Sequence, residues 1–164
     1  MQLKTQLDAI IHFVQKMDIE MINEILDDDK TYQDFEKLLD GPAREFSAVK
    51  VIDQDLTKLN LSDRVFENCD FSGSDFSRAY FEEAEFIGCK AYGAKFKYAN
   101  ADDAKFQKCN LAMTDWEGAN LSSANFQGCK LLGANFARSN NMGLSFEECV
   151  LVNAILQNFS FSNV

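Results

Sequence analysis

The sequence is poor in the side chains from which many catalytic sites are built. Among 164 residues it has one histidine, His12, which lies beside the apolar face of a predicted helix. A triad that uses histidine as its general base could be built only around His12. A histidine packed beside an apolar face is the far more common case. We therefore expect no enzymatic activity and no catalytic residue.

Long hydrophobic runs and an excess of positive charge are also missing. No apolar stretch approaches the roughly 20 residues that cross a bilayer, and the N-terminus lacks a signal-peptide pattern. The formal net charge of −10 argues against a basic surface for direct nucleic-acid binding. We expect a cytoplasmic protein that binds neither membranes nor nucleic acid directly.

The cysteines are not grouped as metal ligands or disulfides usually are. Zinc ligands arrive as close pairs such as C-x-x-C, whereas these five cysteines are each twenty residues apart. An odd number in one column fits a reducing compartment better than a disulfide framework. We expect small packed side chains, no metal site and no cofactor. The five are Cys69, Cys89, Cys109, Cys129 and Cys149.

What the sequence has in abundance is a five-residue repeat. From Phe66 to Phe161 a large side chain recurs at nearly every fifth position, and a small one usually follows three residues later. This period fits neither a helix nor a simple strand, but it fits a chain that turns a corner every five residues. Seven of the eight glycines stand two residues after a large one, where a type II turn requires φ > 0.

A second period, of twenty residues, sets the number of corners in one coil. Twenty is four fives, so each coil has four sides, and equivalent residues stack about 4.8 Å apart. Opposite charges then meet between neighbouring coils. The predicted ion pairs are Asp70 with Lys90, Asp75 with Lys95, Lys95 with Asp115, and Glu85 with Lys105.

Residues 1–45 are predicted to form an α-helical cap. Residues 3–17 place apolar side chains on one helical face, and Asp18 and Thr31 begin two further short helices. The first coil of a solenoid exposes backbone and core, so terminal units need covering. A partner-binding helical arm is the alternative. A weaker five-residue rhythm over residues 46–61 predicts an imperfect first coil.

The repeats resemble those of the pentapeptide-repeat family, whose units read roughly A-(D/N)-L-x-x. The closest units are A-N-L-S-S (119–123), A-N-F-Q-G (124–128) and A-N-F-A-R (134–138). The resemblance implies an all-β solenoid, a right-handed quadrilateral β-helix of about six coils of four pentapeptides, behind an N-terminal α-helical cap. We assign residues 1–45 to the cap and residues 46–164 to the β-helix. A non-enzymatic protein-binding module or scaffold, with an unknown partner, is the function we expect.

An acidic band along the rod offers a candidate partner surface. The segment 66–76, F-E-N-C-D-F-S-G-S-D-F, is similar to the Qnr type of quinolone-resistance repeat. That resemblance implies an alternative function, a DNA mimic that binds DNA gyrase or another topoisomerase. A solvated face with charge pairs is the plainer interpretation. The candidate residues are Glu67, Asp70, Asp75, Glu82, Glu83, Glu85, Asp102 and Asp103.

The C-terminal coil is a candidate self-association surface. Val150, Val152 and Ile155 fall at outward positions, where other coils carry mainly polar or charged residues. Open strand edges beside outward apolar residues suggest contact with another chain. We expect a homodimer through this end.

Overall fold

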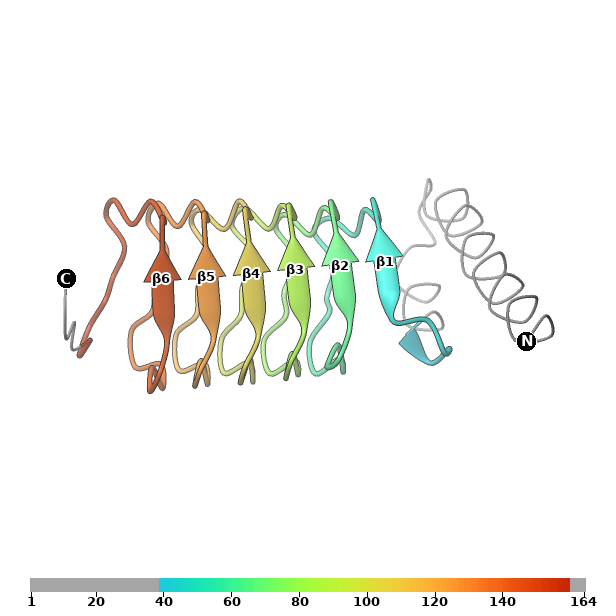
Figure 1. Cartoon of the computed structure of the whole chain (residues 1–164), viewed down its shortest axis with the longest axis horizontal. Coiled ribbons are helices and arrows are strands. Elements are labelled where there is room, and N and C mark those ends of the chain that lie inside the picture. Colours follow the sequence, from blue (N-terminus) through green and yellow to red (C-terminus); the bar gives the residue numbers. More distant parts are fainter. Residues whose placement is uncertain (1–38, 160–164) are drawn as a thin grey trace, which may run out of the picture.

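The computed structural model describes residues 39–159 as a rod of stacked coils (Figure 1). Its six short strands lie side by side in one parallel sheet, in chain order. The helices predicted within residues 1–38 lie outside the described residues. The strands are β1 (Glu45–Ser47), β2 (Val65–Glu67), β3 (Glu85–Ile87), β4 (Lys105–Gln107), β5 (Asn125–Gln127) and β6 (Ser145–Glu147).

The register between neighbouring coils is constant at twenty residues. Phe46 pairs with Phe66 in the sheet. The same offset recurs on the other three sides of the rod through isolated parallel bridges, such as the one between Asn100 and Asn120. The four-sided coil of four pentapeptides is therefore confirmed.

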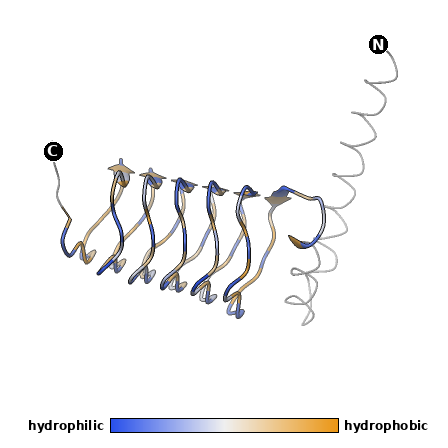
Figure 2. Ribbon diagram, turned by 90° about the horizontal axis from the view of Figure 1, so that it is seen from below, coloured by the Kyte–Doolittle hydropathy of each residue, from blue (hydrophilic) through white to orange (hydrophobic). Residues whose placement is uncertain are grey.

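Each complete coil of the rod has twenty residues and four sides. Coils 1 to 5 are residues 45–64, 65–84, 85–104, 105–124 and 125–144, and the described part of coil 6 is residues 145–159. The strands β1–β6 form the first side. The second, third and fourth sides follow along the chain, and in coil 2 their central residues are Phe71, Phe76 and Phe81. Figure 2 shows the coils stacked along one axis.

Coil 1 is a complete coil despite its weak sequence rhythm. Val51, Leu56 and Leu61, the central residues of its second, third and fourth sides, are at most 1% exposed. Lys50 and Asp55 bridge to coil 2 at the twenty-residue offset. Aliphatic side chains therefore fill the inward positions that phenylalanines fill in coil 2.

Columns of stacked aromatic rings fill the interior. On the first side, the Phe106 ring stacks on Phe86 at 5.0 Å and on Phe126 at 4.7 Å between ring centroids. On the third side, Trp116 stacks on Phe96 at 4.0 Å. Rings of adjacent sides meet edge to face, as Phe106 and Trp116 do at 5.4 Å. The large residue of each pentapeptide is thus the core, as predicted.

The corners tolerate more residue types than the sequence suggests. Every described corner residue has positive φ, yet most are not glycine; Lys58, Arg78 and Tyr98 have φ of 63°, 61° and 56°. This conformation costs an L-residue about 1–2 kcal/mol. Hydrogen bonds between coils hold it in place, since the Arg78 amide donates to the Lys97 carbonyl at 2.9 Å. Glycine or asparagine is therefore favourable at a corner but not required.

One of the four corners differs from the predicted type II turn. Three corners of coil 2 close with a backbone hydrogen bond, in which the amides of Ser74, Ala79 and Ala84 donate to the carbonyls of Phe71, Phe76 and Phe81. At the corner that follows each of β1–β6, the described residues make no such bond. The small inward residue there is a cysteine in coils 2 to 6.

The cysteine thiols take part in hydrogen bonding at this open corner. The Cys89 thiol donates to the Phe66 carbonyl of the preceding coil at 3.2 Å. Cys109 and Cys129 make the equivalent bonds to Phe86 and Phe106. The cysteines pack as small inward residues, as expected, and they also bond one coil to the next.

The predicted ion pairs form on two sides of the rod. Lys95 pairs with Asp75 at 3.4 Å on the third side, and Lys105 pairs with Glu85 at 2.8 Å on the first. Asp70 and Lys90 are neighbours in adjacent coils, as predicted, but their side chains form no ion pair among the described residues. The Asp70 carboxylate instead accepts hydrogen bonds from the amide and hydroxyl of Ser72 within its own coil.

Candidate functional site

The eight acidic residues predicted as one band lie on different sides of the rod. Each step of five residues carries the chain to the next side, so Glu67 lies on the first side, Asp70 on the second and Asp75 on the third. Asp70 and Asp75 are therefore separated from the others, whereas Glu67 lies on the first side two residues along the paired strands from Glu85. A partner surface that includes all eight stays a prediction.

The other five gather where the fourth side meets the first. The amide of Glu83 donates to the Asp102 carbonyl at 3.0 Å, which stacks the two acidic corners of coils 2 and 3. Asp63 of coil 1, which was not among the predicted residues, joins them because its amide donates to the Glu82 carbonyl at 2.9 Å. We call this set the acidic corner: Asp63, Glu82, Glu83, Glu85, Asp102 and Asp103.

Asp63 could have been found from the sequence. It stands twenty residues before Glu83 and forty before Asp103, so it belongs to the same column. The column is not acidic beyond coil 3, because Ser123 and Gly143 occupy the equivalent positions in coils 4 and 5. The acidic corner is thus confined to coils 1 to 3.

One lysine, Lys105, sits within the acidic corner, and two arginines, Arg44 and Arg64, lie beside Asp63 at its coil 1 end. A hydrogen bond to Glu85 raises the pKa of Lys105, and the charges of Glu85, Glu83 and Asp103 raise it further. The lysine is largely exposed to solvent. It therefore neutralises one carboxylate, and the corner keeps a net negative charge.

A hydrogen-bonded ladder fixes the position of Glu82. Its carboxylate accepts hydrogen bonds from the Ser62 hydroxyl at 3.1 Å and from the Asn100 amide at 2.5 Å. The Asn100 side-chain carbonyl accepts a bond from Asn120 at 2.8 Å, and Asn120 accepts one from Asn140. This part of the corner is preorganised, whereas Glu83 and Asp103 project into solvent.

The residues predicted for self-association are exposed side chains of coil 6. Val150 and Val152 flank Leu151 on the second side, and Ile155 begins the third side. All three are about half exposed. Self-association through them stays a prediction.

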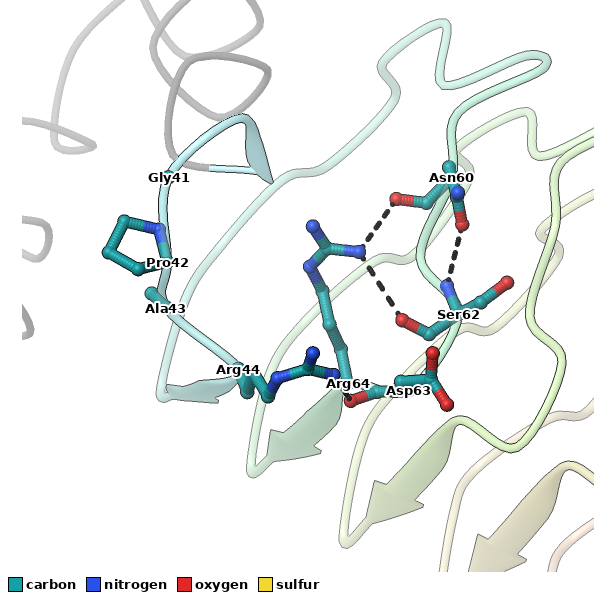
Figure 3. Close-up of a pocket in the computed structure, with 8 residues that line it drawn as sticks. All are labelled: Gly41, Pro42, Ala43, Arg44, Asn60, Ser62, Asp63 and Arg64. Atoms are coloured by element: carbon teal, nitrogen blue, oxygen red, sulfur yellow. Dashed lines mark hydrogen bonds between the residues drawn. The ribbon is translucent and has the colours of Figure 1, made fainter.

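A polar pocket of about 210 Å³ lies beside coil 1, between residues 41–44 and residues 60–64 (Figure 3). The Arg64 guanidinium donates to the Leu39 carbonyl at 2.6 Å and to the Asn60 carbonyl at 3.0 Å. Burial and the nearby charge of Arg44 lower the pKa of Arg64. Because the two terminal nitrogens of Arg64 donate to backbone carbonyls, we assign this residue to fastening residues 39–44 against coil 1; its buried Nε has no hydrogen-bond partner among the described residues.

Residues 39–159 contain neither a metal-binding cluster nor a helix that could span a membrane. No three histidine, cysteine or acidic side chains of this range converge so that they could hold a metal ion. The same range holds no helix of the length and apolarity that a membrane span needs.

The comparisons with known proteins agree with the geometry. A family model described as a pentapeptide repeat region matches residues 59–136. A solved structure of a trypsin-treated form of QnrB1, a plasmid-mediated fluoroquinolone resistance protein, is 27% identical to this chain with a TM-score of 0.65. That match covers 67% of this chain and 57% of the QnrB1 chain, so this chain accounts for less than two thirds of its relative's length.

A second solved structure is more distant. The pentapeptide repeat protein Rfr23 from the cyanobacterium Cyanothece 51142 is 16% identical, with a TM-score of 0.35. The match covers 68% of this chain and 90% of that one. A search of the curated proteins gives no match.

Proposed function

We propose that this chain, whose coiled region is a pentapeptide-repeat β-helix, is a non-enzymatic protein-binding scaffold. The observation that supports the proposal is the contrast between a regular packed core and an uneven distribution of charge on the surface. The carboxylates of the third side are neutralised in ion pairs, such as Lys97 with Asp115 at 3.1 Å and with Glu117 at 3.0 Å. The acidic corner, in contrast, contains six carboxylates against three cations, namely Lys105 within it and Arg44 and Arg64 beside Asp63.

We infer that the acidic corner is the partner-facing surface, and that it binds a protein with a basic groove or ridge. Coils 1 and 3 are about 10 Å apart along the axis. Duplex DNA carries about six charges over such a length. The carboxylates of the corner equal this number and outnumber the neighbouring cations, so the corner keeps a net negative charge that attracts basic partners over a Debye length.

Charge reversal at the exposed tips of the corner tests the proposal. In Glu83→Lys/Asp103→Lys both changes fall at exposed corner positions where lysine and arginine occur in other coils. A matched control, Asp53→Lys/Glu148→Lys, makes the same charge change at corner positions elsewhere. We expect proteins captured from the native host's lysate by the wild type and the control to be lost with the acidic-corner variant. Equal capture by all three would contradict the assignment.

A second candidate function is a DNA mimic that binds DNA gyrase. The net negative charge of the acidic corner and the similarity to QnrB1, a fluoroquinolone resistance protein, favour it. We expect the wild type, and not Glu83→Lys/Asp103→Lys, to restore DNA supercoiling by gyrase in the presence of a fluoroquinolone. No restoration by the wild type would reject the mimic and leave the scaffold proposal standing.

We further propose a homodimer formed through coil 6, and a reducing compartment such as the cytoplasm. A two-fold contact between C-terminal ends buries the same surface on both chains and closes the assembly. The compartment follows from the thiols, because all five cysteines are free although four of them are stacked and buried. A dimerisation test is given in the Discussion.

A further inference from the structure

The outward residues of the second side alternate from coil to coil. In coils 1, 3 and 5 a lysine precedes the inward residue and a large apolar side chain follows it. These pairs are Lys50 with Ile52, Lys90 with Tyr92, and Lys130 with Leu132. In coils 2 and 4 the same positions hold smaller residues, namely Asp70 with Ser72 and Asn110 with Ala112.

The apolar members of these pairs are exposed and the intervening residue is not. Ile52, Tyr92 and Leu132 are 42%, 55% and 43% exposed, whereas Ala112 is 7% exposed. The parallel bridges between coils keep all of them in register on one side of the rod. Over coils 1 to 5 the second side is therefore a face with three ridges separated by two lower rows, and in coil 6 it ends on the exposed Val150 and Val152.

The lysines of this face have no partner among the described residues. Lys50, Lys90 and Lys130 are exposed and form no ion pair within residues 39–159. Lysines on other sides behave differently, since Lys95 and Lys105 each reach a carboxylate in the preceding coil. The second side thus presents positive charges that are available beside exposed apolar groups.

The spacing of the ridges matches the repeat of an α-helix better than that of a β-strand. Ridges two coils apart repeat about every 9.6 Å along the axis, and the lysine and apolar columns lie about 6.6 Å apart across it. A heptad of α-helix is about 10.5 Å long, and a helix with its side chains is about 10 Å wide. A helix lying along the rod therefore contacts both columns and meets successive ridges with residues seven apart.

Extended peptides fit this face less well. A β-strand returns a side chain to the same face about every 6.8 Å, which does not match the ridges. Polyproline II repeats about every 9.3 Å, but domains that bind it use grooves lined with aromatic rings. This face offers one ring, Tyr92.

We propose that the second side is a docking face for an amphipathic helix of a partner protein, with apolar residues and carboxylates on the side that meets the rod. Its apolar residues cover Ile52, Tyr92 and Leu132, and its carboxylates pair with the adjacent lysines. This inference deepens the proposed scaffold function and rests on it. It concerns a surface separate from the acidic corner.

A helical peptide of 21 residues serves as the probe. It carries leucine at two positions and glutamate at two flanking positions of each heptad, with alanine and glutamine elsewhere. We expect saturable binding to the full chain, measured by fluorescence anisotropy. Binding should weaken about tenfold or more in Lys90→Glu/Lys130→Glu, because tenfold corresponds to about 1.4 kcal/mol and two charge contacts become repulsive.

Matched controls separate docking from general attraction. Lys58→Glu makes a similar change at an exposed lysine of the third side and should leave peptide binding unchanged. Glu83→Lys/Asp103→Lys should also leave peptide binding unchanged. The proposal for the acidic corner and the proposal for the docking face can therefore fail independently of each other. A peptide with lysine in place of glutamate should not compete with the glutamate peptide for this face.

Photocrosslinking identifies what covers the face. With benzoylphenylalanine at position 92, we expect crosslinks to the glutamate peptide that unlabelled peptide competes away. Crosslinks to a second copy of the chain, or to residues 1–38 of the same chain, in the absence of peptide would overturn the proposal. Absence of saturable binding, equal loss in Lys58→Glu, or tighter binding of a proline-rich peptide with leucine and glutamate at every third residue would also overturn it.

Discussion

The indole N–H of Trp116 donates a hydrogen bond of 2.9 Å to the hydroxyl of Thr114, and both side chains are almost fully buried. The Thr114 hydroxyl in turn donates to the Leu111 carbonyl at 2.7 Å. A buried donor without an acceptor costs about 1–3 kcal/mol. We therefore expect Thr114→Val, which keeps the shape and removes the hydroxyl, to lower the free energy of unfolding by that amount in urea denaturation.

The same substitution in a Trp116→Phe background is the control. Phenylalanine fits this position, because Phe96 and Phe136 stack on either side of the Trp116 ring, and it carries no N–H. Thr114→Val should cost less there than in the wild type. An equal cost in both backgrounds would show that the indole bond adds nothing.

The phenylalanine column should dominate the stability of the rod. Phe106 is 1% exposed and contacts rings above, below and beside it. Phe106→Ala leaves a cavity and should lower the free energy of unfolding by about 3–5 kcal/mol. Phe146→Ala in coil 6, where the ring is partly exposed, should cost less. A cost below about 1 kcal/mol for Phe106→Ala would be incompatible with this packing.

The cysteines should be graded in reactivity along the column. Cys89, Cys109 and Cys129 are at most 2% exposed, and Cys149 is partly exposed. Hydrogen bonding with the neighbouring thiols and burial raise the pKa of Cys109, and burial raises the pKa of Cys149. Protonated thiols react slowly.

A chromogenic disulfide reagent at neutral pH measures this grading. We expect Cys149 to react first in the folded protein, and the three buried cysteines to react only after denaturation. Mass spectrometry of the labelled peptides identifies which residue has reacted. Rapid native labelling of Cys89, Cys109 and Cys129 would be inconsistent with an inward column that stays closed.

Self-association through coil 6 is tested by light scattering. The wild type should form a dimer, and Val150→Asp/Ile155→Lys should be monomeric, because charges replace apolar side chains at the contact. The substituted positions hold lysine, aspartate or asparagine in other coils, so the variant should fold. Circular dichroism checks this. A wild type that remains monomeric at high concentration would refute the dimer.

The fold could be predicted because its determinants are local and repeated. Large inward residues every five positions fix the sides, and cysteines every twenty positions fix the coil. Even coil 1, where Val51 and Leu56 replace phenylalanines, keeps the register, because any large apolar side chain fills an inward position. Which corner lacks its turn hydrogen bond could not be predicted, because Gly73 and Gly88 occupy the same pentapeptide position and only one of them stands at the open corner.

The surface was predicted less well, because neighbours in sequence are not neighbours in space on this rod. Asp70 and Asp75 lie close in the chain and on different sides. Ion pairing was equally hard to foresee, since Asp115 pairs with Lys97 and not with Lys95. A long exposed side chain can reach several partners at similar distances. At inward positions, packing fixes the neighbours of each side chain. Residues whose numbers differ by a multiple of twenty lie in one column. Grouping the sequence by these columns identifies both the acidic corner and the ridges of the second side.

The constant offset between coils also governs how the rod assembles. Every backbone bond between coils joins residues about twenty positions apart, as Phe96 and Asp115 show. Adding one coil to a folded stack therefore closes a loop of the same length wherever it is added, and the entropic cost per coil does not rise. Folding should spread in both directions from a nucleus within aromatic-rich coils 2 to 5, with each coil templating the next. The coils should therefore unfold in sequence, with coil 6 opening before the middle of the rod. Amide hydrogen exchange should accordingly slow from coil 6 toward the middle.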